Sequence, residues 1–340
     1  MFISTADAVQ LASKLTAKRL ANFMAITLSY VLSKLTKKAR IQGMPWSISV
    51  EPTTACNLRC PECPSGLRSF TRSTGKLDFS LFLSTMDEMH ERLLYLIFYF
   101  QGEPYLHPEF LDMVAYAESK GVYTATSTNA HFLDDENARK TVESGLSRMI
   151  ISIDGSTQET YESYRKTGDL EKVFEGTRNI LKWRKKLGSK TPAVLWQFLV
   201  VKPNEHQIPE IRELAKEYGV DKVAFKTAQI YDYEQGNDLI PSFDKYSRYR
   251  VNTDGTYSVK NKLIDHCWKM WHSCVITWDG QVVPCCFDKD AEHPMGSVAT
   301  SSFAEVWNSS KYRNFRQAIL NSRSSIEMCK NCTEGTKVWG

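Results

Sequence analysis

The chain has 340 residues, of which 42% are hydrophobic and 24% are charged. This length exceeds one average domain, and the composition excludes a chain too polar to fold, so we expect a barrel-sized domain followed by a smaller one. Seven basic residues and one acid fall within residues 1–45, although the net charge of the whole chain is only +4. The rest of the chain carries no basic excess, so we expect no nucleic-acid partner.

Residues 1–45 are predicted to form a basic amphipathic helical arm, because apolar residues recur at helical spacing between residues 5 and 40. The uncharged run Leu20–Ser33 has 14 residues, shorter than the roughly 20 that a spanning helix needs. Two interpretations remain open: the arm lies on an anionic membrane surface or a partner, or it packs its apolar face on the same protein. A transit peptide is a third.

Residues 46–235 alternate between short apolar runs and amphipathic helical segments, which is typical of a parallel sheet covered by helices. The pattern predicts an α/β fold, a partial (β/α)6 TIM-like barrel with two strands fewer than a full barrel. The predicted strands are Ser47–Glu51, Leu94–Phe100, Val122–Ser127, Met149–Asp154, Leu195–Val201 and Lys222–Lys226. The predicted helices are Ser80–Arg92, Pro108–Lys120, Asp135–Glu143, Leu170–Lys186 and Glu205–Tyr218. Residues 236–266 read as a connector and residues 267–340 as a small cysteine-rich domain.

Nine cysteines fall in three groups, with none between Cys63 and Cys267. A disulfide framework would be spread more evenly, and no signal peptide is recognisable, so the clustering favours metal binding in a cytoplasmic chain. Cys56, Cys60 and Cys63 follow the first predicted strand, where such a barrel places its catalytic loops. Three thiolates can hold three corners of a cubane and leave one iron open, as a catalytic site requires. A structural zinc site with a distant fourth ligand is the alternative.

The C-x3-C-x2-C spacing, together with later motifs, resembles the radical S-adenosylmethionine (SAM) enzymes. The motifs are Gln101-Gly-Glu-Pro104, Ser127-Thr-Asn129, Ser152-Ile-Asp-Gly155, Tyr164-Arg165 and Leu199–Asn204, and most of them end predicted strands. Gln101 and Ala130 stand where the family has glycine. The resemblance implies that SAM chelates the open iron of a [4Fe–4S] cluster and that its reductive cleavage gives a 5′-deoxyadenosyl radical. The cofactor contacts it implies are Gly102, Glu103, Ser127, Asn129, Ser152, Asp154 and Arg165, with Arg165 facing the SAM carboxylate.

Cys267, Cys285, Cys329 and Cys332 could fill all four corners of a second cluster. Their surroundings resemble the C-terminal SPASM/twitch extension of radical SAM enzymes, and the number of cysteines favours one auxiliary [4Fe–4S] cluster. A zinc site is the alternative. Cys286 could replace Cys285 as a ligand. Cys274 is left over, either packed in the core or, as a sharper hypothesis, acting as a catalytic hydrogen-atom donor.

The resemblance implies an oxidoreductase of the dehydrogenase, epimerase or peptide cross-linker type. Its auxiliary cluster would assist oxidation, and its electron donor would be a flavodoxin or ferredoxin. The substrate remains open among a sugar, a lipid-linked or other small molecule, and a peptide. Residues 1–45 are too short for a peptide-recognition domain, and the basic arm could touch the inner face of the membrane, which favours a small or lipid-linked substrate. The alternatives are a peptide maturase of the same family, a zinc-knuckle scaffold and a protein that only transfers electrons.

Overall fold

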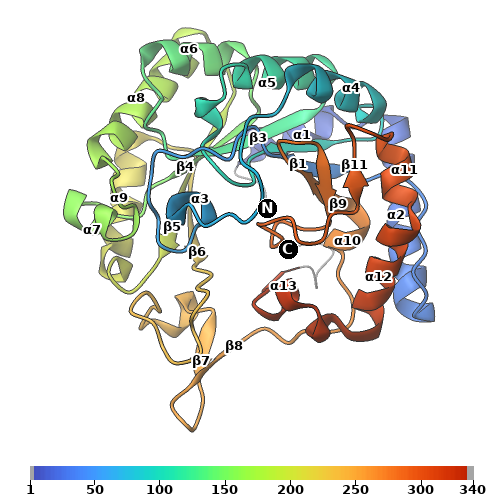
Figure 1. The fold of residues 1–340 in the computed structure, drawn as a ribbon. Helices are drawn as coiled ribbons and strands as arrows, with labels where there is room; N and C mark the ends of the chain where they lie inside the picture. The colour runs from blue at the N-terminus through green and yellow to red at the C-terminus, as the bar shows by residue number, and fades with distance from the viewer. Residues whose placement is uncertain (1–3, 335–340) are drawn as a thin grey trace.

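The computed structural model describes residues 4–334, whose centre is a sheet of six parallel strands in chain order (Figure 1). The strands are β1 (Ser47–Val50), β2 (Tyr95–Phe98), β3 (Tyr123–Thr128), β4 (Arg148–Ser152), β5 (Ala193–Val200) and β6 (Lys222–Thr227). All five neighbouring pairs among them are parallel. The predicted partial (β/α)6 barrel is therefore confirmed, and each of the six predicted strands is present within a few residues.

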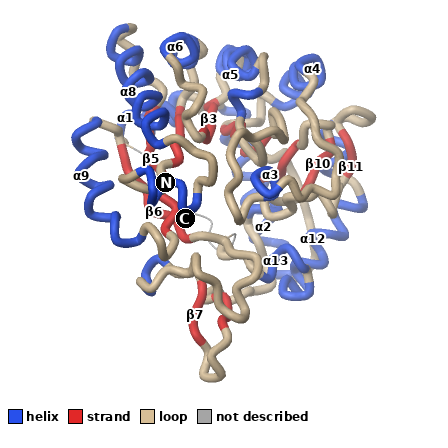
Figure 2. The backbone as a smooth tube through the Cα atoms, turned by 60° about the vertical axis from the view of Figure 1, so that its left-hand side comes forward, coloured by secondary structure: helices blue, strands red, loops and turns tan. Residues whose placement is uncertain are grey.

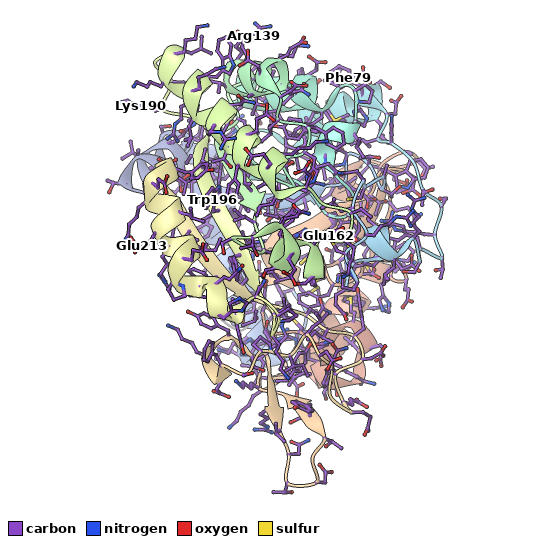
Figure 3. The ribbon with its side chains drawn as sticks, turned by 90° about the vertical axis from the view of Figure 1, so that its left-hand side faces the viewer. Phe79, Arg139, Glu162, Lys190, Trp196 and Glu213 are labelled. Atoms are coloured by element: carbon purple, nitrogen blue, oxygen red, sulfur yellow. The ribbon has the colours of Figure 1, made fainter. Side chains whose placement is uncertain are left out.

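Five long helices cover the outer face of this sheet: α4 (Phe79–Met89), α5 (Phe110–Ser119), α6 (Asp135–Glu143), α8 (Leu170–Lys186) and α9 (Ile208–Tyr218). Aspartates cap two of these helices, since Asp78 accepts from the amide of Leu81 and Asp134 from that of Asn137. The main core lies between helices and sheet. Trp196 of β5 is fully buried there, and its Nε1 donates to Thr177 of α8 at 3.1 Å (Figure 3).

The C-terminal region extends the same sheet. β9 (Ser273–Ile276) pairs parallel with β1, and the antiparallel strands β10 (Gln281–Val283) and β11 (Gly296–Ser297) follow it. Four helices complete the region: α10 (Lys269–His272), α11 (Phe303–Asn308), α12 (Ser310–Ser322) and α13 (Glu327–Lys330). Two separate helices form between residues 303 and 322, because Ser309 ends α11 and caps α12 by accepting from the Tyr312 amide. The division at residue 267 stays a prediction, since strand pairing continues across it.

Residues 236–266, expected as a connector, contain a small hairpin of β7 (Tyr249–Val251) and β8 (Tyr257–Val259). Figure 2 shows this hairpin extending away from the rest of the chain. Three-residue strands are too short for a periodic pattern to reveal, so only the turn at Asn252–Gly255 was visible in the sequence.

The N-terminal arm forms two helices, α1 (Thr5–Ser13) and α2 (Ala17–Thr36), where the sequence suggested one. Thr16 starts the second helix, because its side chain accepts from the Arg19 amide. The arm packs on the body of the protein, but the face of α2 that packs is largely polar, and many of its apolar residues point outward. No helix among residues 4–334 is long and apolar enough to cross a membrane.

Candidate active site

The first cysteine group lies on the loop that leaves the carboxyl end of β1, over the middle of the sheet (Figure 1). Cys63 immediately precedes the short helix α3 (Pro64–Leu67), and its amide donates to the carbonyl of Cys60 at 3.3 Å. A side chain at Gly66 would lie 2.6 Å from the Cys60 backbone, so the loop can close only around glycine. Cys60 is buried, whereas Cys56 and Cys63 are half-buried. The structure thus gathers the three predicted cysteines in one compact loop.

The segment that follows β2 packs against this cysteine loop and forms hydrogen bonds with it. Gly102 has a φ of +75°, and a Cβ there would stand 2.2 Å from the carbonyl oxygen of Thr53. The Gly102 amide donates to the hydroxyl of Ser65 at 2.9 Å. Gln101, which departs from the family's glycine, accepts from the Cys63 thiol at 3.8 Å. Gly102 is therefore required by close backbone approach, and Gln101 contacts one of the candidate ligands.

Glu103 connects the ends of β2 and β3. Its buried carboxylate accepts from the Thr128 hydroxyl and the Asn129 amide, both at 2.8 Å, and burial raises its pKa to about 7. The Asn129 side chain donates in turn to Asn57 of the cysteine loop at 2.7 Å. The next residue, Ala130, has a φ of 64°, the left-handed conformation that explains why the related motif has glycine there. These contacts draw the second and third strand ends towards the cysteines.

Asp154 and Arg165 form a buried ion pair after β4. The other Asp154 oxygen accepts from the Leu199 amide at 2.7 Å, so both carboxylate oxygens have partners. Arg165 also donates from Nη1 to the Cys60 sulfur at 3.8 Å. Burial lowers the pKa of Arg165, but Asp154 and Cys60 outweigh it and hold that pKa well above its ordinary value. These contacts make Asp154 the residue that orients Arg165, and direct contact of Asp154 with SAM stays a prediction.

Ser127 and Ser152 lie on the inner face of the sheet. Ser127 pairs with Ile150, and Ser152 stands two residues further along the same strand as Ile150. Ile150, Ala193 and Leu195 form a small cluster that is separate from the helix-covered core. Both serines therefore share the barrel interior with the predicted SAM contacts, at the carboxyl ends where the loops converge.

The second cysteine group is assembled from segments far apart in the sequence. Cys267, Cys285, Cys329 and Cys332 line one pocket together with Lys269, Arg323 and Glu334. The buried Arg323 donates from Nη2 to the Cys332 sulfur at 3.2 Å, while its Nε has no hydrogen-bond partner among the described residues. A guanidinium with an unsatisfied donor beside four sulfurs fits an anionic group in this pocket.

Cys285 rather than Cys286 shares the pocket with the other three cysteines. Cys286 lies beside it, 3.8 Å from the ammonium of Lys269. A hydrogen bond from Cys285, helped by Lys269, lowers the pKa of Cys286 to about 6. The structure therefore favours Cys285 in the predicted ligand set, with Cys286 the nearest substitute.

Cys274 lies on β9 within the main hydrophobic core, where it is 1% exposed. Burial raises the pKa of its thiol well above its usual range. It does not line the pocket that the other cysteines share. The role of hydrogen-atom donor stays a prediction for Cys274, and this burial argues against direct contact with a substrate.

Both cysteine groups fit iron–sulfur clusters. Burial raises the pKa of Cys56 to about 12 and of Cys329 to about 11, so these thiols ionise near neutral pH only when bound iron supplies positive charge. No three Cys, His, Asp or Glu side chains of residues 4–334 come close enough together to hold one metal ion. A cubane, in contrast, binds each thiolate to a separate iron atom. Arg165 beside Cys60 and Arg323 beside Cys332 complement the negative charge of such clusters.

A polar link joins the two cysteine groups, and the sequence did not reveal it. The Tyr231 amide donates to Glu62 at 2.9 Å, next to Cys63, and Lys289 donates to the Tyr231 hydroxyl at 2.8 Å. Lys289 follows Cys286 closely in the chain. Its ammonium lies near enough to both Cys63 and Cys286 for thiolates at those positions to attract it electrostatically. The loops that carry the two groups therefore face each other across Tyr231 and Lys289.

A second contact that the sequence missed is the buried Glu51, directly after β1. The Arg72 guanidinium donates two hydrogen bonds of 2.8 and 2.6 Å to its carboxylate, and the Trp278 amide donates to the same carboxylate at 3.2 Å. This joins the cysteine loop to the C-terminal region. The one sequence feature that could have indicated this contact is an acidic residue at the end of a buried strand. A separate hollow, between α7 (Gln158–Tyr164) and α8, has no cysteine in its lining.

The families that match this chain agree with two cysteine sites of this kind. Residues 50–215 match the model of the radical SAM superfamily, and residues 267–333 match the SPASM domain, described as an iron–sulfur cluster-binding domain. The chain belongs to the radical SAM superfamily and carries a SPASM domain. A [4Fe–4S] cluster and SAM are the cofactors of this superfamily, and the SPASM domain adds auxiliary iron–sulfur binding. These matches favour an enzyme over the zinc-knuckle scaffold.

Among curated relatives, the chain is 27% identical to a tungsten-containing aldehyde ferredoxin oxidoreductase cofactor-modifying protein of Pyrococcus furiosus, covering 84% of this chain and 86% of that protein. It is 24% identical to a PqqA peptide cyclase of Gluconobacter oxydans, covering 87% and 85%. Among solved structures, SuiB of Streptococcus suis bound to SAM has a TM-score of 0.64 at 14% identity, covering 89% of this chain and 75% of that one. This last likeness supports the fold.

Proposed function

We propose that this chain is a radical SAM oxidoreductase whose substrate binds between two iron–sulfur sites. Cys56, Cys60 and Cys63 would hold the cluster that binds SAM. A single auxiliary [4Fe–4S] cluster would be held by Cys267, Cys285, Cys329 and Cys332. The observation that carries the proposal is the link through Tyr231 and Lys289, which brings the two cysteine-bearing loops face to face.

When bound, the first cluster and SAM would supply the chemistry for removing a hydrogen atom from the substrate, and the auxiliary cluster would supply a one-electron acceptor. The chain's own residues would position the reactants. Arg165, fixed by Asp154 beside Cys60, is placed to pair with the SAM carboxylate. Gly102 would keep this segment close to the cysteine loop, and the Glu103 carboxylate would accept from the SAM ammonium.

The substrate proposal rests on charge. Lys289 and Tyr231 present an ammonium and a phenol between the two groups, and Lys269, paired with Glu334, lines the second pocket. Such groups suit a substrate that carries a carboxylate. A peptide with an acidic side chain fits this, and the name of one relative, a PqqA peptide cyclase, supports the peptide class. A small molecule that carries a carboxylate is the second candidate, because the same ammonium and phenol would bind it. We place the enzyme in the cytoplasm, with a flavodoxin or ferredoxin as electron donor.

The test is anaerobic reconstitution of the full chain, followed by iron analysis and by incubation with dithionite and SAM. We expect brown protein with about eight iron atoms per chain and release of 5′-deoxyadenosine. Colourless protein that binds only zinc would overturn the proposal. Brown protein that binds no SAM would instead identify a protein that only transfers electrons.

The substrate class is tested separately with Lys289→Ala and Tyr231→Phe. Neither substitution removes a predicted SAM contact, and Tyr231→Phe keeps the amide that bonds Glu62, so 5′-deoxyadenosine release without substrate should persist. With each candidate substrate, the Lys289→Ala variant should show a KM raised about tenfold, as expected for the loss of one charge-assisted contact. An unchanged KM for every carboxylate-bearing substrate would contradict the assignment.

A further inference from the structure

The outer face of α2 is an apolar stripe in a helix whose inner face is largely polar. Among the described residues, eight of the fourteen exposed large hydrophobic side chains lie between residues 9 and 35. Six of them follow one face of α2 at helical spacing: Leu20, Met24, Leu28, Val31, Leu32 and Leu35. Met24 is 56% exposed and Leu35 is 73% exposed. We refer to these six residues as the α2 stripe.

The inner face of α2 is fixed by hydrogen bonds that determine which face points outward. Asn22 donates to the Met44 carbonyl and accepts from the Met44 amide, both at 2.8 Å. The buried Arg19 donates to the carbonyls of His90 at 2.8 Å and Gly121 at 2.6 Å. Turning the stripe inward would break these bonds and leave buried polar groups unsatisfied, so its exposure is a fixed property of the fold.

The exposed charged residues of the arm itself have one sign. Lys34, Lys37, Lys38 and Arg40 are exposed at its C-terminal end, and within residues 4–334 they form no ion pair. Lys18 stands at the other end, paired with Glu91 on the surface. The arm's single acid, Asp7, is buried in an ion pair with Arg148 at the start of β4. The exposed arm therefore offers apolar and cationic groups without an acid of its own.

We propose that the α2 stripe and its lysines dock this protein on an anionic membrane surface, with α2 lying in the interface. A helix of this kind buries its apolar side among the lipid chains, while basic residues at its edges meet the headgroups. A second copy of the chain fits less well, because two apposed stripes would bring lysines towards lysines with no acid between them.

The site is kept away from the docked surface. Several inner contacts of the arm are with segments that precede the strands, including Met44 before β1, His90 before β2, Gly121 before β3 and Ser147 before β4. Further along α2, Tyr30 packs on Trp268 and Trp271, close to Cys267 of the second cysteine group. The cysteine loop and the predicted SAM contacts lie at the opposite, carboxyl ends of the strands. Figure 1 shows α1 and α2 behind the sheet and α3 in front of it. A docked enzyme would thus open its site to the aqueous side, where an anionic peptide or small molecule can reach it.

Vesicle sedimentation with the reconstituted full chain tests the proposal. The probes are phosphatidylcholine vesicles with or without about 30 mol% phosphatidylglycerol. We expect binding to the anionic vesicles that weakens in high salt, with little binding to neutral ones. Leu28→Glu/Leu35→Glu should lower the partition coefficient at least about tenfold, and Lys34→Glu/Lys38→Glu should do the same. The matched control Phe243→Glu/Val251→Glu replaces exposed apolar residues elsewhere and should bind like the parent chain.

All these changes are at exposed positions, and each variant is checked for parental helix content and iron content before comparison. Absence of binding to anionic vesicles by the parent chain would overturn the proposal. A dimer that Leu28→Glu/Leu35→Glu dissociates, without vesicle binding, would assign the stripe to a second copy and also overturn it. The measurement is independent of catalysis, because 5′-deoxyadenosine release in detergent-free buffer should be equal in all variants.

Discussion

The two cysteine groups reach similar chemistry by different folding routes. The first occupies eight consecutive residues of one loop, and its supports come from the next three strand ends. The second joins Cys267 and Cys285 to Cys329 and Cys332, which only the tertiary fold brings into one pocket. The first group is half open, since Cys56 and Cys63 are half-buried, whereas three of the four cysteines of the second are buried.

The difference matches the tasks that we propose for the two sites. An open thiolate loop with an arginine and a glutamate near it leaves room for a cofactor on the free iron. A closed pocket with a buried arginine favours a fully ligated cluster that exchanges only electrons. Substitutions in the two groups should therefore have separable effects.

The largest effect is expected from removing one ligand of each group in turn. Cys60→Ala should abolish 5′-deoxyadenosine release and remove about four iron atoms per chain. Cys329→Ala should remove a similar amount of iron, yet retain SAM cleavage by the first site. Iron analysis and chromatography of the nucleoside check both variants. If Cys329→Ala abolished cleavage in a protein that still holds the first cluster, the proposed division between the sites would be wrong.

The second-largest effect is expected on the auxiliary cluster, and it should differ between the adjacent residues Cys285 and Cys286. Cys285→Ala should lose the auxiliary cluster, because this thiol lines the pocket with the other three. Cys286→Ala should retain the cluster, since its thiol faces Lys269 instead. Electron paramagnetic resonance of the dithionite-reduced protein distinguishes one cluster from two. The reverse pattern would make Cys286 the ligand.

The contrast also shows how far sequence reasoning reaches. The strands and the first cysteine group were predictable because hydrophobic runs and short spacings are local. The pocket around Arg323, the choice of Cys285 and the link through Tyr231 and Lys289 were not, because they depend on side-chain direction and on contacts across the fold. Asp154 illustrates the limit: its position after β4 was predicted, but its pairing with Arg165 was not.

The arm shows a different limit. Helical periodicity predicted an amphipathic helix, and ordinary packing would bury its apolar side. The structure buries Arg19, Asn22, Ser29 and Ser33 instead, because loop carbonyls and amides nearby need their hydrogen bonds. A hydrophobic pattern identifies the two faces of a helix, but the partners on the body decide which one turns inward.

A smaller effect is expected on the reduction potential of the auxiliary cluster when Arg323 of the second pocket is replaced. Arg323→Gln removes positive charge beside Cys332, so the auxiliary reduction potential should fall by about 60 mV, the one-electron equivalent of a tenfold change. Arg313→Gln, on the exposed side of the preceding helix α12, is the control and should leave the potential unchanged. A redox titration followed by paramagnetic resonance gives both values. Equal potentials in the two variants would show that Arg323 does not act on the cluster.

Glu103 gives the pH dependence of the first site. Burial raises its pKa from 4.5 to about 7, so between these pH values the folded chain binds more protons than the unfolded chain. The free energy of unfolding of the cluster-free protein should therefore fall as pH rises across this range, by up to about 3 kcal/mol. Glu103→Gln should flatten that slope, and Glu109→Gln, at an exposed position, should not. Urea denaturation at several pH values measures it, and an unflattened slope would contradict the assignment.

The smallest effect is expected at Cys274, the cysteine that neither group uses. Its thiol is packed beside Arg316 and Tyr312 in the core, so Cys274→Ala should cost about 1 kcal/mol of stability through lost packing. Nucleoside release and product stereochemistry should not change. The sharper measurement is product formed in deuterated water. Deuterium at the reacting carbon in the parent chain but not in the variant would restore Cys274 as a hydrogen donor, and would mean that this core position opens to the substrate during turnover.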